Sequence, residues 1–504
     1  MKILMVSSEA VPWAKTGGLA DMVSALSITL AKLGHDVRIV IPRYYSVDKS
    51  KLTELPGAMG TPMGGGIEEW SAVFTADMPT PAQDKSSKKN PVKVYFIDHE
   101  IFFGRDGIYG SQQESDFIDN PRRFTFFCRA AFQLCRKIKW IPDVIHAHDW
   151  PAAVAPVYLK FAERTPGSSG EFRNTVSLLT IHNLGYQGIY HKDNYDYAGL
   201  GWDVYYNAGF EDYNMMNMLK AGLYSADKLN TVSPNYAEET KTQALGFRLD
   251  GVLRYRSGDY SGILNGIDYD VWNPAKDKCI PATYSKDDMS GKAKAKGALQ
   301  KEFGLPKDPS VPVIGMVTRL TDQKGVGELF GPTYGSAWSI CRDMDIQMVL
   351  LGSGERWCEN EISGLSSRLS NFKAKIGYNE ETSHLIEAGS DFFLMPSRYE
   401  PCGLNQMYSL AYGTIPIVRA TGGLVDTVEN FNQKTGSGTG FMFNFLSPSS
   451  IYDTVGWAIY AWYNQRDDIE NMRKRGMSLD FSWETSAQKY IDIYEATRKK
   501  MGMK

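Results

Sequence analysis

Hydrophobic residues near the N-terminus alternate between two patterns. Residues 3–7 are a short, nearly continuous apolar run, as expected of a strand buried on both faces of a sheet. From residue 19 to residue 33 the apolar side chains recur at helical spacing, and Gly34 predicts the end of that helix. A second apolar run covers residues 37–41 and is closed by Pro42. Strand, helix and strand at this spacing predict a βαβ unit, and therefore a parallel sheet with helices on both faces.

The alternation continues through the first half of the chain, with one interruption. Further strands are predicted at residues 92–97, 144–146 and 177–181. A helix is predicted at 121–139, where Cys128 and Cys135 lie about two turns apart as core residues. Residues 56–91 are instead rich in Gly, Pro, Ser and Lys, which predicts an excursion at the surface.

A second α/β series begins after the turn-rich stretch at residues 265–268. It predicts strands at residues 311–317, 346–352, 373–376, 391–396 and 414–418. This pattern predicts two parallel-sheet domains that are joined near residue 270. Ligands of such sheets lie at the carboxyl ends of the strands, and two facing domains would form a cleft.

Length and composition narrow the class of protein. A chain of 504 residues exceeds the size at which one core usually keeps growing, which agrees with two domains. The net charge of −3 argues against nucleic acid or an anionic membrane as the main partner. The cysteines form no CxxC pair, the histidines show no zinc-like spacing, and no apolar stretch suits a membrane span or a signal peptide. We therefore expect a reduced, cytoplasmic protein without a metal or another cofactor.

The loop between the first strand and the first helix is a candidate for binding phosphate. It reads KTGGLAD at residues 15–21 and lacks both the Walker and the GxGxxG pattern. Gly17 and Gly18 would let backbone amides approach an anion at the helix N-terminus, and Lys15 would add positive charge. A tight turn beside a surface lysine is the alternative interpretation.

Two loops of the second series offer similar chemistry. Arg319 and Lys324 directly follow the first strand of that series, where they suit a pyrophosphate, although a solvated pair of cations is the alternative. Thr421, Gly422 and Gly423 lie between its last predicted strand and a helix, which predicts a concave arrangement of amides. Three such loops at equivalent ends of two sheets favour phosphate binding.

Polar side chains at other strand ends supply acid–base groups. Glu400, in the stretch RYEPCGL, precedes a predicted helix at 403–412, where a carboxylate can bind sugar hydroxyls or stabilise a cation. The helix dipole alone would also favour a glutamate there. His182 and Asn183 follow one strand, and HAHD at 146–149 follows another. His beside Asp suggests a metal or a triad, but no GxSxG motif accompanies them, so strand-end polar residues are the alternative.

Together, the loops resemble one family, the bacterial glycogen synthases and plant starch synthases. The similar blocks are SE at 8–9, KTGGLAD at 15–21, HAHDW at 146–150, TIHNL at 180–184, LKAG at 219–222, TVSP at 231–234, LNGID at 264–268, TRLTDQKG at 318–325, SRYEPCGL at 397–404 and TGGL at 421–424. They occur in the family's order, and KTGGLAD and EPCGL are the most specific.

The resemblance implies a GT-B fold, with two Rossmann-like α/β domains whose parallel sheets face each other across a deep cleft. Residues 1–265 would form the N-terminal domain, which binds the acceptor glucan, and residues 266–483 the C-terminal domain, which binds the nucleotide-sugar donor. A last helix at 484–504 would pack back onto the N-terminal domain.

The implied reaction is transfer of glucose from ADP-glucose to the non-reducing end of an α-1,4-glucan, with retention of configuration and no metal. Front-face displacement through an oxocarbenium-like state is expected, and Glu400 as a covalent nucleophile is the alternative. The open alternatives for function are UDP-glucose as donor, another acceptor, and a non-catalytic glucan-binding protein.

The resemblance also assigns roles to individual residues. Lys15 and Gly18 would approach the donor phosphates, and Arg319 and Lys324 would neutralise the ADP leaving group. Tyr378 would stack on the base.

At the sugar, Glu400 and Cys402 would line the glucose pocket, with Glu400 holding sugar hydroxyls. The backbone carbonyl of His182 would stabilise positive charge at C1, and Asp149 and Asp21 would help close the acceptor side. The remaining residues expected at the substrates are Gly17, Asn183, Asn265, Gly403, Leu404, Thr421, Gly422 and Gly423.

Two positions depart from the family pattern. Pro151 follows Trp150 where the family commonly has histidine, which concerns the loop on the acceptor side. Asn405 stands where threonine or isoleucine is frequent after EPCGL, which concerns contacts to the donor.

Overall fold

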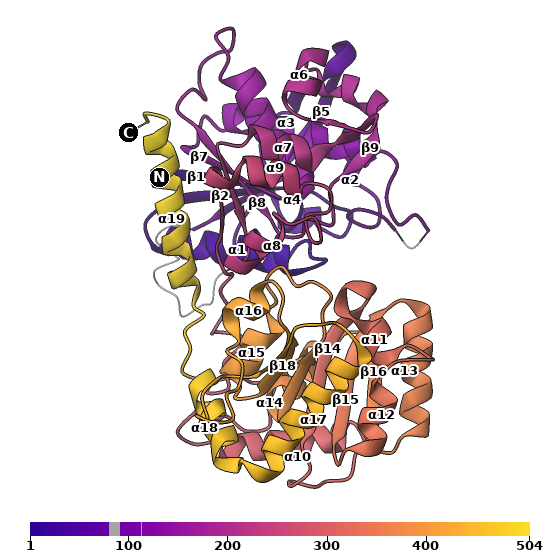
Figure 1. Ribbon diagram of the computed structural model, residues 1–504. Coiled ribbons are helices and arrows are strands. Elements are labelled where there is room, and N and C mark those ends of the chain that lie inside the picture. The colour runs from indigo at the N-terminus through magenta and orange to yellow at the C-terminus, as the bar shows by residue number, and fades with distance from the viewer. Residues whose placement is uncertain (80–90, 112, 504) are drawn as a thin grey trace. The chain divides into compact units, whose positions relative to one another are not determined.

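The computed structural model describes residues 1–79, 91–111 and 113–503, and it divides into two compact units (Figure 1). The first comprises Met1–Val232, Ala237–Ile263 and Trp483–Lys504, and the second comprises Ser233–Tyr236 and Leu264–Ser482. Each unit has its own, largely parallel sheet with helices packed against it. The α/β class predicted from the sequence is therefore confirmed for both units.

The main sheet of the first unit places its earliest strand in the middle. Among the described residues its order is β13-β12-β8-β7-β1-β2-β6-β5-β3, with β4 paired to β5. The strands are β1 (Lys2–Val6), β2 (Asp36–Pro42), β3 (Thr53–Glu54), β4 (Met59–Pro62), β5 (Glu68–Asp77), β6 (Lys93–Asp98), β7 (Val144–His148), β8 (Val176–Ile181), β12 (Lys228–Thr231) and β13 (Tyr260–Gly262). The strand order reverses at β1 and β7, and parallel α/β sheets bind ligands beyond the carboxyl ends of the strands at such a point.

The first helix forms as the apolar pattern predicts. In α1 (Gly18–Lys32), Met22, Leu26 and Leu30 are at most 1% exposed and form the buried face. Gly34 adopts φ 92°, a left-handed conformation that ends the helix with little strain because glycine has no Cβ.

Further helices and a small sheet complete the first unit. Its other helices are α2 (Glu100–Phe103), α3 (Asn120–Lys137), α4 (Asp149–Ala152), α5 (Val154–Tyr158), α6 (Trp202–Asn207), α7 (Met218–Ser225), α8 (Pro234–Glu239), which begins in the second unit, α9 (Asp250–Tyr255) and α19 (Trp483–Lys500). A small antiparallel sheet contains β9 (Ile189–His191), β10 (Glu211–Asp212) and β11 (Met215–Asn217).

The second unit has a fully parallel sheet in the order β16-β15-β14-β17-β18-β19. Its strands are β14 (Val313–Leu320), β15 (Gln347–Gly354), β16 (Phe372–Ile376), β17 (Phe392–Met395), β18 (Ile415–Arg419) and β19 (Phe441–Phe443). Its helices are α10 (Ser290–Glu302), α11 (Val326–Phe330), α12 (Ala337–Asp343), α13 (Arg356–Arg368), α14 (Glu380–Gly389), α15 (Asn405–Ala411), α16 (Gly423–Thr427), α17 (Pro448–Asn464) and α18 (Arg466–Gly476).

Alternate residues of the second sheet enter two separate hydrophobic cores. In β15, Met348 and Leu350 belong to one core, whereas Val349 and Leu351 belong to the other. Because successive side chains of a strand point to opposite faces, both faces of this sheet are buried. This explains why its strands, apart from the edge strand β16, contain continuous apolar runs in the sequence.

The prediction of a surface excursion at residues 56–91 was partly wrong. Residues 80–90 lie outside the described residues, but β5 runs antiparallel to β6 within the main sheet, and Val73 is completely buried there. The Gly, Pro and Lys residues around this strand dominate the composition of the segment and obscured it. Similarly, the helix predicted at 403–412 starts at Asn405, because Gly403 has φ 72°.

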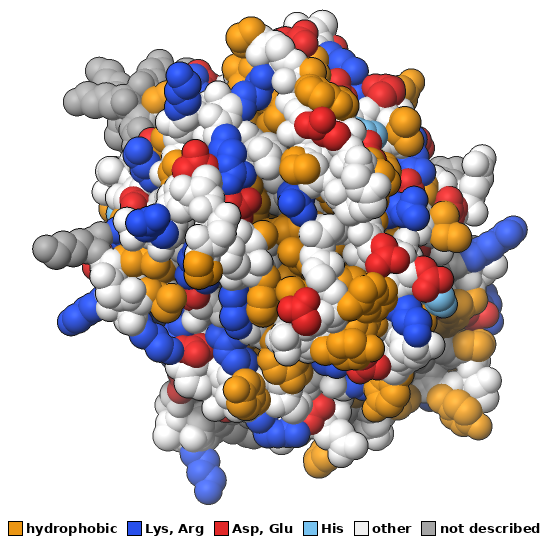
Figure 2. All heavy atoms as spheres, turned by 90° about the horizontal axis from the view of Figure 1, so that it is seen from above, with side chains coloured by type: hydrophobic (Ala, Val, Ile, Leu, Met, Phe, Trp, Pro, Cys, Tyr) orange, Lys and Arg blue, Asp and Glu red, His pale blue; other side chains and the backbone are white. Residues whose placement is uncertain are grey.

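The surface agrees with the nearly balanced composition. On the face shown in Figure 2, basic and acidic side chains are interspersed, with hydrophobic side chains between them. Of the helices in the described part of the chain, none combines the length and the apolar character that a membrane span requires.

Candidate active site

Topology gathers the predicted site residues into two groups, one in each unit. In the first unit, the loops after the neighbouring strands β1 and β7 contain Lys15 and Asp149. In the second unit the strand order reverses at β14 and β17, whose following segments contain Lys324 and Glu400. Both groups therefore lie where parallel α/β sheets bind their ligands.

The loop after β1 is held by Glu9, a residue to which the sequence analysis gave no role. Its carboxylate is buried and accepts hydrogen bonds from the Thr16 amide (2.5 Å), the Thr16 hydroxyl (2.7 Å) and the Tyr109 hydroxyl (2.6 Å). A buried charge is tolerated only with such partners, so Glu9 fixes the KTGGLAD loop at the start of α1. The sequence signal for this role was a glutamate shortly after the predicted strand at residues 3–7.

The same loop brings Lys15 and Asp21 together. The Lys15 ammonium lies 2.7 Å from an Asp21 carboxylate oxygen, and the two side chains are 50% and 36% exposed. Gly17 precedes α1, with Gly18 as the first helical residue, and no side chain caps this helix start. The first backbone amides of α1 thus lie beside a cation, which suits an anion.

Asp149 connects the loops after β7 and β8. It is the first residue of α4, has φ 57°, and its carboxylate accepts the amides of His182 (2.6 Å) and Asn183 (3.4 Å). Burial raises the pKa of Asp149 to about 7, although these amide bonds oppose the shift. Asp149 therefore orients the backbone around His182 and exchanges its proton near neutral pH.

His146, His148 and His182 lie side by side next to Asp149. The rings of His146 and His148 lie 4.1 Å apart, and His148 Nδ1 is 3.1 Å from His182 Nε2. Burial lowers the pKa of His182 to about 3 and lowers those of His146 and His148 well below the usual range. All three imidazoles are consequently neutral at physiological pH.

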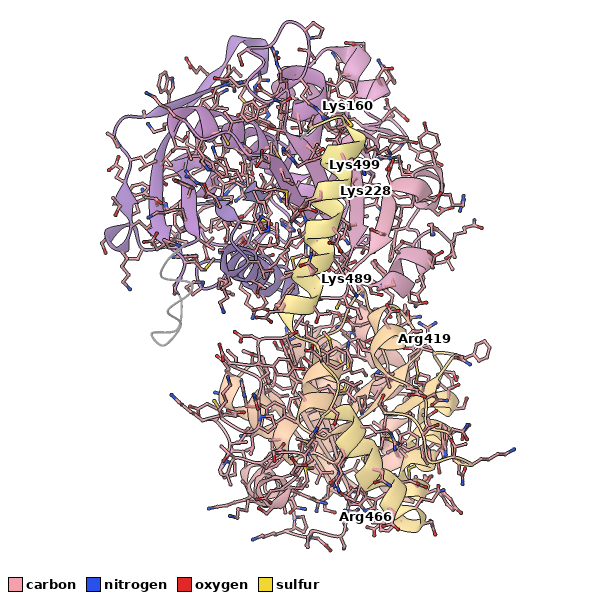
Figure 3. All side chains as sticks on the ribbon, turned by 90° about the vertical axis from the view of Figure 1, so that its left-hand side faces the viewer. Lys160, Lys228, Arg419, Arg466, Lys489 and Lys499 are labelled. Atoms are coloured by element: carbon pink, nitrogen blue, oxygen red, sulfur yellow. The ribbon has the colours of Figure 1, made fainter. Side chains whose placement is uncertain are left out.

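Helix α19 reaches these histidines from the far end of the sequence. Figure 3 shows α19 lying along the first unit, with Lys489 and Lys499 on it. The Tyr494 hydroxyl lies 2.7 Å from His146 Nδ1, and the other imidazole nitrogen of His146 lies 2.7 Å from the Thr180 hydroxyl. Both nitrogens of His146 therefore have partners, which fixes its ring orientation.

In the second unit, Lys324 and Glu400 form an ion pair. Their nitrogen and oxygen atoms are 2.6 Å apart, with side chains 17% and 7% exposed, and the Ser397 hydroxyl donates to the same carboxylate oxygen at 2.8 Å. Glu400 is thus oriented by a cation and a hydroxyl. Lys324 carries three N–H donors, so it can contact a phosphate while it holds Glu400.

Arg319 is the second-to-last residue of β14 rather than part of the loop that follows it, because β14 extends to Leu320. Its side chain is exposed, and its guanidinium is 3.5 Å from the Gln323 side chain. The neighbouring Arg398 is instead engaged by the carboxylates of Asp322 and Glu328. Arg319 is therefore the arginine better able to contact a ligand.

The glycines of the TGG segment serve close backbone packing. A Cβ on Gly422, whose φ is 48°, would lie 1.8 Å from the Glu400 carbonyl oxygen, and the Gly423 amide donates to that oxygen at 3.0 Å. The Thr421 and Leu424 amides also donate to backbone carbonyls. The amides of Thr421, Gly423 and Leu424 are therefore bonded within the backbone, and Gly422 and Gly423 position the backbone of Glu400. Contact of this segment with the donor stays a prediction.

Cys402 and Asn265 also meet in this unit. Burial raises the pKa of the Cys402 thiol to about 12, while a hydrogen bond from the Asn265 backbone opposes the shift. Cys402 is therefore a neutral thiol. Gly403 and Leu404 lead directly into α15.

The two departures from the family pattern have structural explanations. The Asn405 side chain donates to the Val317 carbonyl at 2.7 Å, which ties α15 to β14. Pro151 lies within α4, and its carbonyl accepts a hydrogen bond from the buried Cys128 thiol at 3.2 Å.

Tyr378 lies beyond an edge strand of the second sheet. It follows β16 and Gly377, and its side chain is 70% exposed. An exposed ring at the carboxyl end of a strand is suitably placed for stacking on a base. Among the described residues, one further group has metal-ligating side chains, Asp277, Cys279 and His384, and it is separate from the residues above.

The chain matches two family models. The model described as "Starch synthase catalytic domain" covers residues 2–255, and "Glycosyl transferases group 1" covers residues 299–475. Among curated proteins, the glycogen synthase of Treponema denticola is 59% identical over 504 residues, covering all of both chains. Glycogen synthase 1 of Geobacter metallireducens is 45% identical, covering 100% of this chain and 98% of the relative.

Solved structures agree with the sequence relatives. The catalytic domain of starch synthase IV from Arabidopsis thaliana, bound to ADP and acarbose, has a TM-score of 0.85 and 30% identity, with 99% of each chain covered. A sucrose-phosphate synthase from Thermosynechococcus elongatus has a TM-score of 0.57 at 16% identity over 98% of each chain, and shares the fold. The predicted resemblance and the predicted GT-B fold are confirmed. The chain belongs to the glycogen synthase and starch synthase family of GT-B glycosyltransferases.

Proposed function

We propose that the protein lengthens α-1,4-glucan in the cytoplasm, by transferring glucose from ADP-glucose to the non-reducing end with retention of configuration. The ion pair of Lys324 and Glu400 at the reversal point of the second sheet is the observation that carries the proposal. ADP and acarbose in the Arabidopsis starch synthase IV structure, and the names of the full-length relatives, support these substrates.

The second unit is the proposed donor unit. Lys324 and Arg319 neutralise the charge that develops on the ADP leaving group as the bond from C1 to phosphate breaks. Glu400, held by Lys324 and Ser397, accepts hydrogen bonds from hydroxyls of the transferred glucose. Tyr378 stacks on the base, and Cys402 and Asn265 line the sugar site.

The first unit supplies the proposed acceptor side. The His182 backbone, oriented by Asp149, presents its carbonyl to the positive charge at C1. A neutral His182 ring adds no positive charge beside the developing cation. Lys15, with the amides that follow Gly17, approaches the donor phosphates, and Asp21 holds Lys15.

Retention follows from displacement on one face of the sugar. The bond from C1 to the phosphate oxygen breaks as the acceptor 4-hydroxyl oxygen bonds to C1 on the same side. The released phosphate oxygen takes the hydroxyl proton, so no protein group has to act as the base. Glu400 interacts with sugar hydroxyls in this scheme and forms no bond to C1.

The test is incorporation of labelled glucose into glycogen from ADP-glucose and UDP-glucose in parallel, with EDTA present. Incorporation from ADP-glucose with EDTA supports the proposed donor and glucan acceptor. Incorporation from UDP-glucose alone would retain the reaction and change the donor. No incorporation from either by folded protein would contradict glucan synthesis, and transfer to small acceptors would then be measured.

A further inference from the structure

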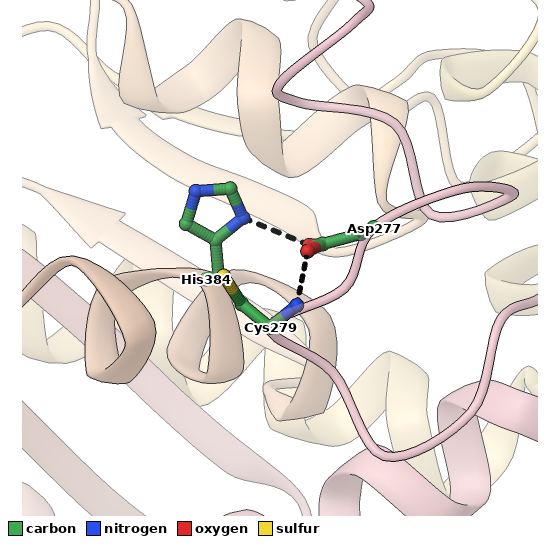
Figure 4. A group of neighbouring side chains, drawn as sticks. All are labelled: Asp277, Cys279 and His384. Carbon is green, nitrogen blue, oxygen red and sulfur yellow. Dashed lines mark hydrogen bonds and ion pairs between the residues drawn. The ribbon is translucent and has the colours of Figure 1, made fainter.

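A group of side chains outside the proposed substrate residues has the composition of a metal site. Asp277 and Cys279 lie in the segment before α10, and His384 lies on α14 (Figure 4). One carboxylate oxygen, the thiol sulfur and one imidazole nitrogen all lie within 4.8 Å of one another. All three residues belong to the second unit, so the group does not depend on how the units are placed.

Neighbouring residues already orient two of these side chains. One oxygen of Asp277 lies 2.8 Å from His384 Nδ1 and accepts the Tyr412 hydroxyl at 2.6 Å, while the other accepts the Cys279 amide at 2.8 Å. Trp272 stacks on the His384 ring at 3.9 Å with an interplanar angle of 8°. Ligand side chains of metal sites are commonly oriented by such outer hydrogen bonds.

The surroundings of the group favour a cation. The side chains of Asp277 and His384 are each only 2% exposed, whereas Cys279 is exposed, so an ion can enter from the side of the sulfur. Glu380 and Glu381 occupy the first turn of α14, about one turn before His384. Two acidic side chains therefore precede His384 on the same helix.

We propose that Asp277, Cys279 and His384 bind a zinc ion, with water as the fourth ligand. Thiolate and imidazole ligands favour zinc over magnesium or calcium, which prefer oxygen ligands. Zinc bonds of about 2.0–2.3 Å at tetrahedral angles place ligand atoms about 3.3–3.6 Å apart, so small side-chain shifts close the site.

The proton balance of binding follows from the ligand states. The zinc ion lies between His384 Nδ1 and the Asp277 carboxylate, and it replaces the hydrogen bond that joins them in this structure. The Cys279 thiol loses its proton to solvent as the sulfur–zinc bond forms. The hydrogen on Nδ1 of His384, which the Asp277 carboxylate accepts in this structure, moves to Nε2 so that Nδ1 is free to bind the ion. Each bound ion therefore releases the Cys279 thiol proton.

Sequence spacing gave no sign of this site. Asp277 and Cys279 are separated by one residue, but His384 is more than a hundred positions later in the sequence. The expectation of a protein without metal rested on the absence of local motifs, and here the fold joins distant residues.

The cysteines make the test selective. In the described part of the chain, Cys279 is exposed, whereas Cys128, Cys135, Cys341, Cys358 and Cys402 are buried. Full-length protein, stripped with EDTA and dialysed, is titrated with zinc by calorimetry and with cobalt(II) by absorption spectroscopy. We expect one equivalent of each ion to bind, with a thiolate-to-cobalt charge-transfer band. Zinc should also protect Cys279 from alkylation, as measured by peptide mapping.

Two variants decide the outcome. Cys279→Ser changes an exposed side chain, so the fold should survive, and it should lose the charge-transfer band and at least ten-fold in zinc affinity. His191→Gln is the control, because exposed His191 lies 3.1 Å from Asp193 without a cysteine, and zinc binding should be unchanged. Absence of the band in the wild-type protein, or zinc affinity unaltered by Cys279→Ser, would overturn the proposal.

Discussion

Replacing Lys324 by alanine separates two roles that the ion pair with Glu400 combines. The Lys324 ammonium is 2.6 Å from Glu400, whose side chain is 7% exposed, and the other partner of that carboxylate oxygen is the neutral Ser397 hydroxyl. The substitution therefore leaves an almost buried carboxylate without a counter-charge, and it also removes a proposed phosphate ligand. The first effect lowers stability, and the second weakens binding of ADP.

The two effects have different expected sizes. Breaking a buried ion pair costs about 3–5 kcal/mol, and the partial exposure of Lys324 favours the lower value, about 3 kcal/mol. For a unit of this size, that corresponds to a fall of about 6–12 °C in Tm. A charged hydrogen bond to phosphate is worth about 1.5–3 kcal/mol, which predicts ADP binding about 10- to 150-fold weaker.

Calorimetry of unfolding and of ADP binding should be compared for Lys324→Ala, Glu400→Gln and the double variant. The double variant has no unpaired carboxylate, so it should recover part of the lost Tm while its ADP binding stays weak. Glu400→Gln alone should bind ADP nearly normally and lose turnover. If Lys324→Ala binds ADP within about two-fold of wild type, Lys324 is only a counter-ion for Glu400 and the assignment to the diphosphate is wrong.

Three further substitutions test the site. Asp149→Asn removes a carboxyl group whose pKa is raised from 3.8 to about 7. The wild-type protein should therefore lose stability relative to the variant as pH rises from about 4 to about 7, and the difference should level off above that. Parallel Tm profiles over this range would refute the shift. Glu9→Ala leaves the Thr16 amide and the Tyr109 hydroxyl without their carboxylate acceptor. It should lower the free energy of unfolding, measured in urea, by about 2–4 kcal/mol. A change below about 0.5 kcal/mol would show that Glu9 does not hold the loop. Gly422→Ala places a Cβ against the Glu400 carbonyl and should reduce glucan synthesis by orders of magnitude. Gly327→Ala is the control, because a Cβ there meets nothing within 4 Å, and it should leave glucan synthesis close to wild type. Equal losses of glucan synthesis in the two variants would contradict the packing argument.

The sequence predicted the regular parts of the fold well because their signals are local. Residues 3–7 and 37–41 correspond to β1 and β2, and the inner strands of the second sheet contain apolar runs because both of its faces are buried. Short strands such as β12, β13 and β19 were not predicted, since three or four residues give no clear period. β5 was missed because loop residues surround it.

For the site, the sequence located the loops but not the contacts within them. Lys324 and Glu400 were each singled out, yet only the fold shows that they are paired. The sequence alone assigned no role to Glu9, because a buried carboxylate cannot be recognised before its hydrogen-bond donors are known. Gly422 was expected to present amides to phosphate, whereas its conformation serves the approach of two backbone segments.

The position of α19 has a consequence for synthesis of the protein. The helix follows the second unit in the sequence but packs in the first, where Tyr494 contacts His146 and the Tyr490 hydroxyl lies 3.0 Å from the Asn230 side chain. During translation, about 220 residues of the second unit must be made before α19 leaves the ribosome, which takes about 10–45 s at 5–20 residues per second. For that time the nascent first unit lacks the hydroxyl partners of two buried polar side chains. Its final folding therefore waits for the completed chain, and ribosome-bound fragments without α19 should remain sensitive to protease after most of the first unit has emerged.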